Sequence, residues 1–343
     1  MSRQSTGEMQ MSYSLSILDK SPIPPGATAT EALANTVALA QLAEQLGYHR
    51  FWVAEHHNTP LLASSAPEIL ISYILARTSR IRVGSGGVML QHYSPFKVAE
   101  TFNLLSALAP GRVDLGVGKA PGGLPYSTRA LQNYHHPASK PDFPAQLAEL
   151  DAFLGEGLPD EHPLAGARAT PQAPIAPGRI LLGGSPDSAR LAARLGWDFA
   201  YAGHFNGDPL NIQQSVDVYR QWSGKAPALA LFAFVAETRE QALSRVGELK
   251  LFKLFLEDGS SFNVPSREAA EEFARQAGAT SYRLEEKHPH VIAGTAGDVR
   301  AELDAMHQRY GIGEFIIDIP VTQFALRRKA ISLLAEAREP LAA

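Results

Sequence analysis

The chain has 343 residues, of which 45% are hydrophobic and none is cysteine, and its formal net charge is −4. The lack of thiols excludes disulfides, thiolate nucleophiles and cysteine-ligated zinc sites. No run of lysine or arginine stands out, so neither nucleic acid nor an anionic membrane is indicated as a partner. No window approaches the roughly 20 apolar residues of a membrane span. We therefore expect a protein that acts on small molecules.

Residues 1–12 are polar and lack the apolar stretch of a signal peptide. We expect them to form a loose tail, and we expect a cytoplasmic location. No linker divides the remainder of the chain, which predicts a single domain over residues 13–343.

Strands and helices alternate along the first third of the chain. Thr28 and Glu31 have the spacing of a capping box, and Gly47 ends the helix that they begin. This alternation predicts parallel βα units. The other predicted elements are strands at Tyr13–Leu18, Phe51–Ala54, Ile81–Leu90 and Arg112–Gly118, and helices at Pro67–Thr78 and Pro95–Leu108.

A stretch rich in proline and glycine, Ala120–Pro177, interrupts the alternation and contains one predicted helix, Asp142–Leu154. It is long for a connection, so we expect it to cover a functional site. The alternation then resumes, and the total of eight strands favours a closed α/β barrel, the (β/α)8 TIM barrel, over an open doubly wound sheet. The later strands are Arg179–Gly183, Asp198–Ala202, Ala228–Val235 and Glu314–Ile319, and the helices are Asp187–Leu195, Pro209–Trp222, Gln241–Leu256, Arg267–Gln276, Ala296–Tyr310 and one from Thr322.

The segment Arg50–Asn58 is an apolar run that ends in Glu55, His56 and His57. In α/β barrels the chemistry lies at the C-terminal ends of the strands, where these three side chains are expected. Because side chains alternate along a strand, Glu55 and His57 should share one side and His56 should face the other. The competing interpretation is that they are solvated polar residues at a strand end.

Three weaker signals fall at other strand ends. Gly183 and Gly184 lead into a helix with Ser185 as N-cap, which suits a phosphate, although an ordinary capped helix explains the same residues equally well. Glycines inside the strand at Gly84–Val88 indicate a bulge, a strained peptide or a ligand against the backbone. Lys119 is a cation just beyond a predicted strand, or simply a solvated lysine.

Four segments are distinctive in combination: Phe51–Asn58, Arg82–Leu90, Glu100–Leu105 and Gly111–Gly118. Together they resemble the bacterial luciferase-like flavin monooxygenases, and within that superfamily most of all the single-chain oxidoreductases. The resemblance covers most of Leu15–Ala337. It implies a (β/α)8 barrel, reduced FMN as cosubstrate, and molecular oxygen captured as a flavin C4a-hydroperoxide that oxidises a small organic substrate.

The resemblance also implies roles for individual residues. His56 matches the catalytic histidine and Glu55 matches an acid near the flavin. Gly86 and Gly87 match a non-proline cis peptide beneath the flavin ring. The phosphate-binding turn is matched by Gly184, Ser185 and Ser188, and Lys119 stands where luciferase has an arginine. A histidine that titrates near neutral pH could manage the protons of the reaction.

The sequence also predicts how the cofactor reaches the site. One phosphate turn favours FMN over FAD, and no nicotinamide-binding fingerprint is visible, so we expect a separate flavin reductase, as in two-component flavin systems. We expect a homodimer.

Three alternatives stay open. The first is a deazaflavin-dependent oxidoreductase that transfers hydride on the same fold. The second is a metal-dependent hydrolase that uses His288, His290 and Asp318. The favoured hypothesis, a luciferase-like monooxygenase, predicts no metal site. The third is a flavin-storing or structural relative that has lost catalytic activity. It stays open because Lys119 stands where luciferase has an arginine.

Overall fold

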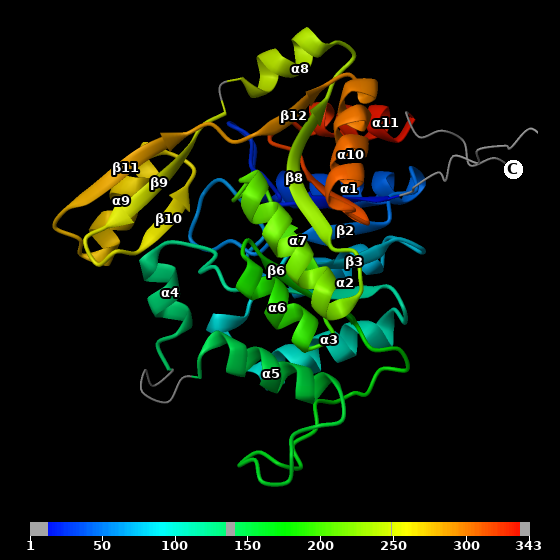
Figure 1. The fold of residues 1–343 in the computed structure, drawn as a ribbon, viewed down its shortest axis with the longest axis vertical. Coiled ribbons are helices and arrows are strands. Elements are labelled where there is room, and N and C mark those ends of the chain that lie inside the picture. The colour runs from blue at the N-terminus through cyan, green and yellow to red at the C-terminus, as the bar shows by residue number, and fades with distance from the viewer. Residues whose placement is uncertain (1–12, 135–140, 248, 337–343) are drawn as a thin grey trace, which may run out of the picture.

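The computed structural model describes residues 13–134, 141–247 and 249–336 (Figure 1). The tail expected at residues 1–12 therefore lies outside the described residues. So do residues 337–343 of the domain that we expect over 13–343.

Eight parallel strands form a closed barrel, which confirms the predicted (β/α)8 architecture. Each strand pairs with its neighbours in the order β1, β2, β3, β5, β6, β7, β8 and β13, and β13 pairs again with β1. All eight predicted barrel strands are present. They are β1 (Ser14–Asp19), β2 (Arg50–Val53), β3 (Arg82–Ser85), β5 (Val113–Gly118), β6 (Gly178–Gly183), β7 (Asp198–Ala202), β8 (Ala228–Val235) and β13 (Glu314–Asp318).

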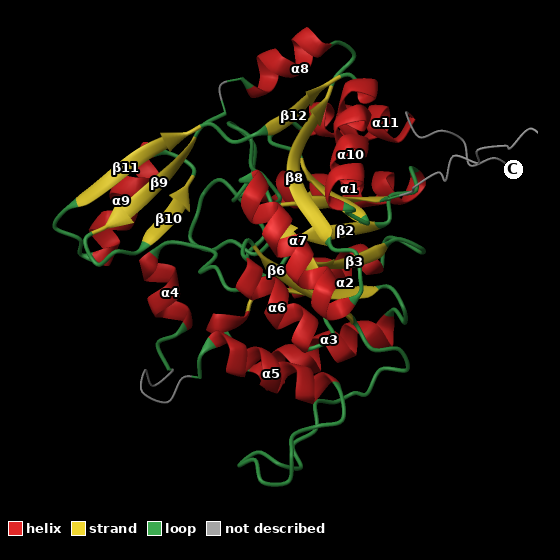
Figure 2. Ribbon diagram, in the orientation of Figure 1, coloured by secondary structure: helices red, strands yellow, loops and turns green. Residues whose placement is uncertain are grey.

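Helices pack around the barrel and bury its outer surface (Figure 2). The predicted capping box is present, because Thr28 accepts a hydrogen bond from the Glu31 N–H and the Glu31 carboxylate accepts one from the Thr28 N–H. The surrounding helices are α1 (Ala29–Gln45), α2 (Pro67–Leu75), α3 (Pro95–Leu108), α5 (Phe143–Leu154), α6 (Pro186–Arg194), α7 (Pro209–Ser223), α10 (Ala296–Tyr310) and α11 (Phe324–Glu336).

Two further short strands extend the barrel. The predicted strand Ile81–Leu90 is divided into β3 and β4 (Val88–Met89) by the Gly86–Gly87 peptide, and a 3-10 turn, η1 (Leu90–His92), follows. β4 pairs with β5, and β12 (Val291–Gly294) pairs with the last part of β8.

The interior of the barrel has its own small core, separate from the one beneath the helices. Its buried residues alternate with outward-facing ones along each strand, so the strand period of two decides which side chains face inward. The buried members of this interior core are Leu18, Trp52, Ala54, Ile180, Ala200, Ala230 and Ile316.

Charged side chains close the end of the barrel where the strands begin. The buried Asp114 carboxylate accepts hydrogen bonds from Arg50, at 3.0 Å, and from Arg82. Arg50 also lies 3.0 Å from Glu314 on β13. These ion pairs tie β2, β3, β5 and β13 together, so an opening for ligands belongs at the other end.

The prediction of a single helix over Gln241–Leu256 is wrong. Helix α8 spans only Arg239–Val246, and Leu251–Leu256 forms β9, the central strand of an antiparallel sheet with β10 (Ser261–Val264) and β11 (Tyr282–Lys287). The alternating residues Phe252, Leu254 and Leu256 pack with α9 (Arg267–Ala277), which explains why a strand is favoured there. This small sheet projects from the barrel at the left of Figure 1.

Candidate active site

Seven residues continue the inward-facing positions to the C-terminal end of the barrel. Six of them lie two or four residues after an interior core residue of the same strand. The seventh, Gly86, has its Cα directed at the core residues Leu18 and Trp52. They come from strands or strand ends all around the barrel, so they converge on one mouth. They are Lys20, His56, Gly86, Gly184, His204, Phe232 and Asp318.

Glu55 and His57 face away from this mouth. The His57 Nε2 atom lies 2.7 Å from Glu55 Oε1, the Tyr93 hydroxyl donates to the same oxygen at 2.7 Å, and the Met89 N–H donates to Oε2 at 3.0 Å. Burial raises the pKa of Tyr93, as does the Glu55 carboxylate, so the phenol stays a donor. The predicted alternation is confirmed, and the buried Glu55 carboxylate is not on the face that carries His56.

His56 faces the interior and borders a pocket of about 600 Å³ that is lined in part by Ile23, Leu62 and Ala63. Its Nδ1 atom is buried and has no hydrogen-bond partner among the described residues. Burial lowers the pKa of His56 to about 4, and the nearby Lys20 charge lowers it further in the same direction. The expectation that this histidine titrates near neutral pH is therefore wrong, and the ring is neutral at pH 7.

A second group of polar residues at the mouth was not predicted as one site. The Lys20 Nζ atom lies 2.6 Å from Asp318 Oδ2, at the neighbouring ends of β1 and β13. His204, just beyond β7, is buried, and burial lowers its pKa to about 4. The sequence signal that could have indicated this site is the position of the residues along their strands. Lys20 and Asp318 each lie two residues beyond an inward-facing apolar residue.

Glycines let the backbone of β3 approach its neighbours closely. The Gly86–Gly87 peptide is cis, as the resemblance implied. A Cβ atom at Gly86 would lie 2.7 Å from a Leu18 methyl group, and one at Gly87 would lie 2.7 Å from the Gly116 carbonyl oxygen. No side chain fits at either position without movement of the surroundings.

The predicted turn into α6 is present. Ser185 caps the helix, with its hydroxyl oxygen accepting from the Ser188 N–H at 3.3 Å, and Pro186 is the first helical residue. Asn211 on α7 donates to the Gly184 carbonyl at 2.7 Å and so holds the turn, a contact that the sequence did not indicate. The Asp187 side chain is exposed and pairs with Arg190, so it leaves the end of the helix open.

Lys119 lies at the end of β5, the strand that pairs with β6. Its side chain is exposed, and its carbonyl accepts a hydrogen bond from Gln91 at 2.8 Å. The lysine therefore lies on the strand next to the Gly184–Ser188 turn, within the same end of the barrel.

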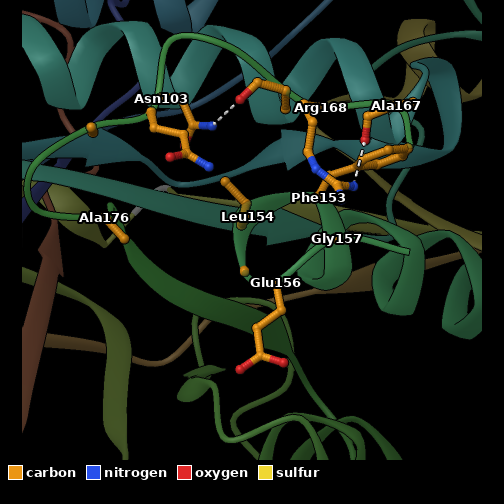
Figure 3. A pocket seen from close by; sticks show the side chains of 12 residues that line it. Asn103, Phe153, Leu154, Glu156, Gly157, Ala167, Arg168 and Ala176 are labelled. Carbon is orange, nitrogen blue, oxygen red and sulfur yellow. Dashed lines mark hydrogen bonds between the residues drawn. The ribbon is translucent and has the colours of Figure 1, made fainter. Parts of the chain in front are cut away.

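The long connection from Ala120 to Pro177 divides into two described parts, and the first contacts the strand end that carries Glu55, His56 and His57. The His57 N–H donates to the Gly122 carbonyl at 2.8 Å, and the short helix α4 (Pro125–Leu131) follows. The second part lines a separate pocket of about 200 Å³ with α3 and α5, where Asn103 donates to the Ala169 carbonyl (Figure 3). None of the predicted site residues lines this second pocket.

The residues of the metal hydrolase alternative do not come together. His288 is exposed and lies 3.5 Å from Glu286 on the projecting sheet, whereas Asp318 is buried at the barrel mouth against Lys20. In the part of the chain that the structure describes, no three histidine or acidic side chains are grouped to hold a metal ion. In the same described part, no helix combines the length and apolar character needed to cross a bilayer.

Known proteins share both the sequence and the fold. The family model described as luciferase-like monooxygenase matches residues 11–313. N-acetyl-S-alkylcysteine monooxygenase of Bacillus subtilis (strain 168) is 45% identical, over 94% of this chain and 97% of that protein. The crystal structure of apo-MsnO8 superposes with a TM-score of 0.74 at 33% identity, covering 95% of this chain and 98% of that one.

More distant structures share the fold alone. The oxygenating constituent of 3,6-diketocamphane monooxygenase from Pseudomonas putida, in complex with FMN, has a TM-score of 0.66 at 17% identity and covers 96% and 99% of the two chains. An F420-dependent secondary alcohol dehydrogenase has a TM-score of 0.65 at 16% identity and covers 96% and 100%. From the family match and the relative at 45% identity, the chain belongs to the luciferase-like monooxygenase family.

Proposed function

We propose that this oxidoreductase is a monooxygenase that uses reduced FMN and molecular oxygen. The observation that carries the proposal is the convergence, at one end of the barrel, of a serine-capped helix N-terminus, two glycines without room for side chains, and a neutral, partly buried histidine. One oxygen atom enters the substrate, the other leaves as water, and the bound flavin supplies the two electrons and the activation of oxygen.

The turn at Gly184–Ser188 supports a flavin mononucleotide. Its glycine backbone and the positive end of the α6 dipole offer one phosphate site, with Lys119 on the neighbouring strand as a further cation. The Gly86–Gly87 backbone would lie against the flavin ring. A deazaflavin enzyme that transfers hydride is the second candidate, because the F420-dependent dehydrogenase shares the fold.

His56 would serve as a proton acceptor. Its neutral ring, with an unpartnered Nδ1 atom beside the 600 Å³ pocket, can accept a hydrogen bond or a proton from a bound molecule. Glu55, held on the other side of the strand, would fix the backbone from which His56 projects.

We propose S-alkyl thioethers of N-acylated cysteine as the first substrate class to test. The support is the 45% identity, over nearly the whole of both chains, to the protein named N-acetyl-S-alkylcysteine monooxygenase. The apolar residues Ile23, Leu62 and Ala63 beside His56 suit an alkyl group.

A homodimer and a separate reductase complete the proposal. Neighbouring helices α2 and α3 expose four large apolar side chains, a surface suited to burial against a second copy. These are Ile69, Tyr73, Leu104 and Leu108. The cytoplasmic location expected from the composition stays a prediction.

The test is oxygen uptake by the purified protein with FMN and an added NADH-dependent flavin reductase. N-acetyl-S-ethylcysteine should yield a product that has gained one oxygen atom from ¹⁸O₂, or a fragment that carries it. Neither NADH nor NADPH should support turnover without the reductase. Hydride transfer to F420 without oxygen uptake would instead support the second candidate.

A further inference from the structure

Lys20 is the exposed member of a buried ion pair at the barrel mouth. Its Nζ atom lies 2.6 Å from Asp318, yet 28% of the Lys20 side chain is exposed and only 3% of the Asp318 side chain. The Asp318 Oδ2 atom is buried and, apart from this ion pair, has no hydrogen-bond partner among the described residues. The ammonium group carries three donors and is the more exposed charge of the pair, so the pair presents donors to the mouth.

Phe232 fixes the position of this ammonium group. Lys20 Nζ lies 5.1 Å from the centre of the Phe232 ring, and the His204 ring packs edge-on against the same phenyl group with centres 5.7 Å apart. Lys20, Phe232 and His204 thus form one continuous wall at the ends of β1, β8 and β7. The backbone of β1 is held from outside by Asp19, which pairs with Arg327 on α11 at 3.3 Å.

Two histidines at the mouth have a ring nitrogen without a hydrogen-bond partner among the described residues. In the described structure the Nδ1 atoms of His204 and His56 are both buried without a hydrogen bond, and His204 is only 7% exposed. A buried polar atom without a partner is costly, so a bound molecule that supplies one is favoured. β2 and β7 lie opposite one another in the eight-strand ring, which places the two histidines on either side of the space that Lys20 faces.

The chemistry of these groups selects an anion with several acceptor oxygens. Lys20 can only donate, and each neutral imidazole can donate from one ring nitrogen, so the three side chains can surround a group that only accepts. A carboxylate has two such oxygens and a charge that an ammonium group recognises. A cationic group would be repelled by the Lys20 charge, and the Asp318 carboxylate is buried behind the ammonium group with which it forms an ion pair.

We propose that Lys20 determines specificity by binding a carboxylate of the substrate, with His204 lining the same subsite and His56 between this subsite and the apolar pocket. This inference rests on the proposed monooxygenase function and deepens it. It assigns the acidic end of the substrate to the β1–β13 side of the mouth, and the alkyl end to the pocket of Ile23 and Leu62.

The test compares N-acetyl-S-ethylcysteine with its methyl ester, which removes only the charge. We expect the wild type to prefer the acid, and Lys20→Met to lower the acid-to-ester ratio of kcat/KM by about 10- to 100-fold, the range for a hydrogen bond to a charged group. Lys20→Arg should keep much of the preference. Because Lys20→Met leaves the Asp318 charge uncovered, Lys20→Met/Asp318→Asn is measured beside it and should lose the preference too.

Lys225→Met is the matched control, since Lys225 pairs with Asp198 at 2.9 Å at the opposite end of the barrel. It should keep the wild-type ratio. An acid preference that survives in the double variant would overturn the proposal.

Calorimetric binding of the acid and the ester to the wild type and to Lys20→Met needs no turnover. This measurement therefore separates the role of Lys20 in substrate binding from the proposed monooxygenase function. Acid-selective binding that depends on Lys20, without oxygen insertion, would reject the proposed function alone, whereas equal binding of acid and ester would reject the role of Lys20.

Discussion

Glu55 Oε1 and His57 Nε2 lie 2.7 Å apart on the outer side of β2, and this pairing leaves His56 alone on the face that points into the barrel. Three adjacent polar residues therefore have two different tasks. The outer pair joins the strand end to Tyr93 and to the backbone of Met89, while His56 is free to meet a ligand.

His56→Ala should abolish most turnover and leave the fold nearly intact. His56 has no side-chain hydrogen bond at Nδ1 to lose, so we expect the free energy of unfolding to change by about 1 kcal/mol or less. Loss of the proton acceptor should lower kcat on the order of 10²-fold or more. Steady-state kinetics and thermal melting measure the two effects.

His57→Ala is the matched comparison, because it removes a neighbouring imidazole that faces the other way. It should cost more stability than His56→Ala, about 1 to 3 kcal/mol, because the buried Glu55 carboxylate loses one partner. Its kcat should fall less. If the order of the kcat effects were reversed, the roles of the two histidines would have to be exchanged.

Acid should destabilise the protein between pH 6.5 and pH 4. The folded-state pKa of His204 is about 4, against an ordinary value of 6.5, because burial disfavours the charged ring, so the unfolded chain binds more protons over this interval. The stability is fully present above pH 6.5 and is lost as the pH falls through the folded pKa. Urea unfolding at pH 7, 5.5 and 4.5 would measure the slope.

His204→Gln should flatten that slope, since glutamine does not titrate. His56 contributes in the same direction and remains in this variant, so part of the slope should persist. The same replacement at the exposed His288 is measured beside it, as a control for the exchange of histidine for glutamine. A slope that is identical in the wild type and His204→Gln would show that His204 does not titrate as its burial requires.

Gly184→Ala should weaken FMN binding without harming the fold. The nearest atom to an added Cβ is Cβ of Asn206, at 3.8 Å, which is ordinary contact distance. The methyl group would stand where we propose that the phosphate approaches, so we expect the Kd for reduced FMN to rise about tenfold or more. Anaerobic fluorescence titration gives the affinity and thermal melting gives the control.

Gly183→Ala is the contrasting variant in the same turn. An added Cβ there would lie 2.3 Å from Cβ of Ser188, so this change should destabilise the fold itself. Should Gly184→Ala bind FMN as tightly as the wild type, the turn is an ordinary capped helix and not the phosphate site.

Charges placed on α2 and α3 should prevent dimerisation. Ile69 is 69% exposed and Leu108 is 67% exposed, and a buried lysine at either position would oppose burial of this face against a second copy. Ile69→Lys/Leu108→Lys should sediment as a monomer under conditions where the wild type is a dimer. Leu210→Lys, at a site 71% exposed on α7, is the control and should stay dimeric. A wild type that is monomeric at all concentrations would reject the proposed interface.

The barrel could be predicted because each of its strands can be recognised from its own residues. Runs such as Phe51–Val53 are buried on both sides, so the sequence shows them as continuous apolar segments between helices with clear caps. The prediction of a helix over Leu251–Leu256 failed because the burial of this segment depends on α9, which comes later in the chain. The residues of that segment alone do not distinguish a helix from a strand.

The site was predictable only where one strand carried several signals. The opposite directions of Glu55 and His56 follow from strand geometry, and the Ser185 cap follows from the residues around it. Lys20, His204 and Asp318 come from three strand ends that are far apart in the sequence, and no local pattern links them. The low pKa of His56 depends on burial by the folded chain, which no local pattern contains.

Among the described residues, the ion pairs of Asp114 with Arg50 and Arg82 close the end of the barrel where the strands begin. Cofactor, oxygen, substrate and product must all pass through the mouth that holds Lys20 and His56. A flavin whose ring lies against Gly86 would be deeper than a substrate at Lys20, so the substrate would block its departure. Catalysis should therefore follow a fixed order in which the reduced flavin enters first and the oxidised flavin leaves last, and excess substrate should trap the flavin inside.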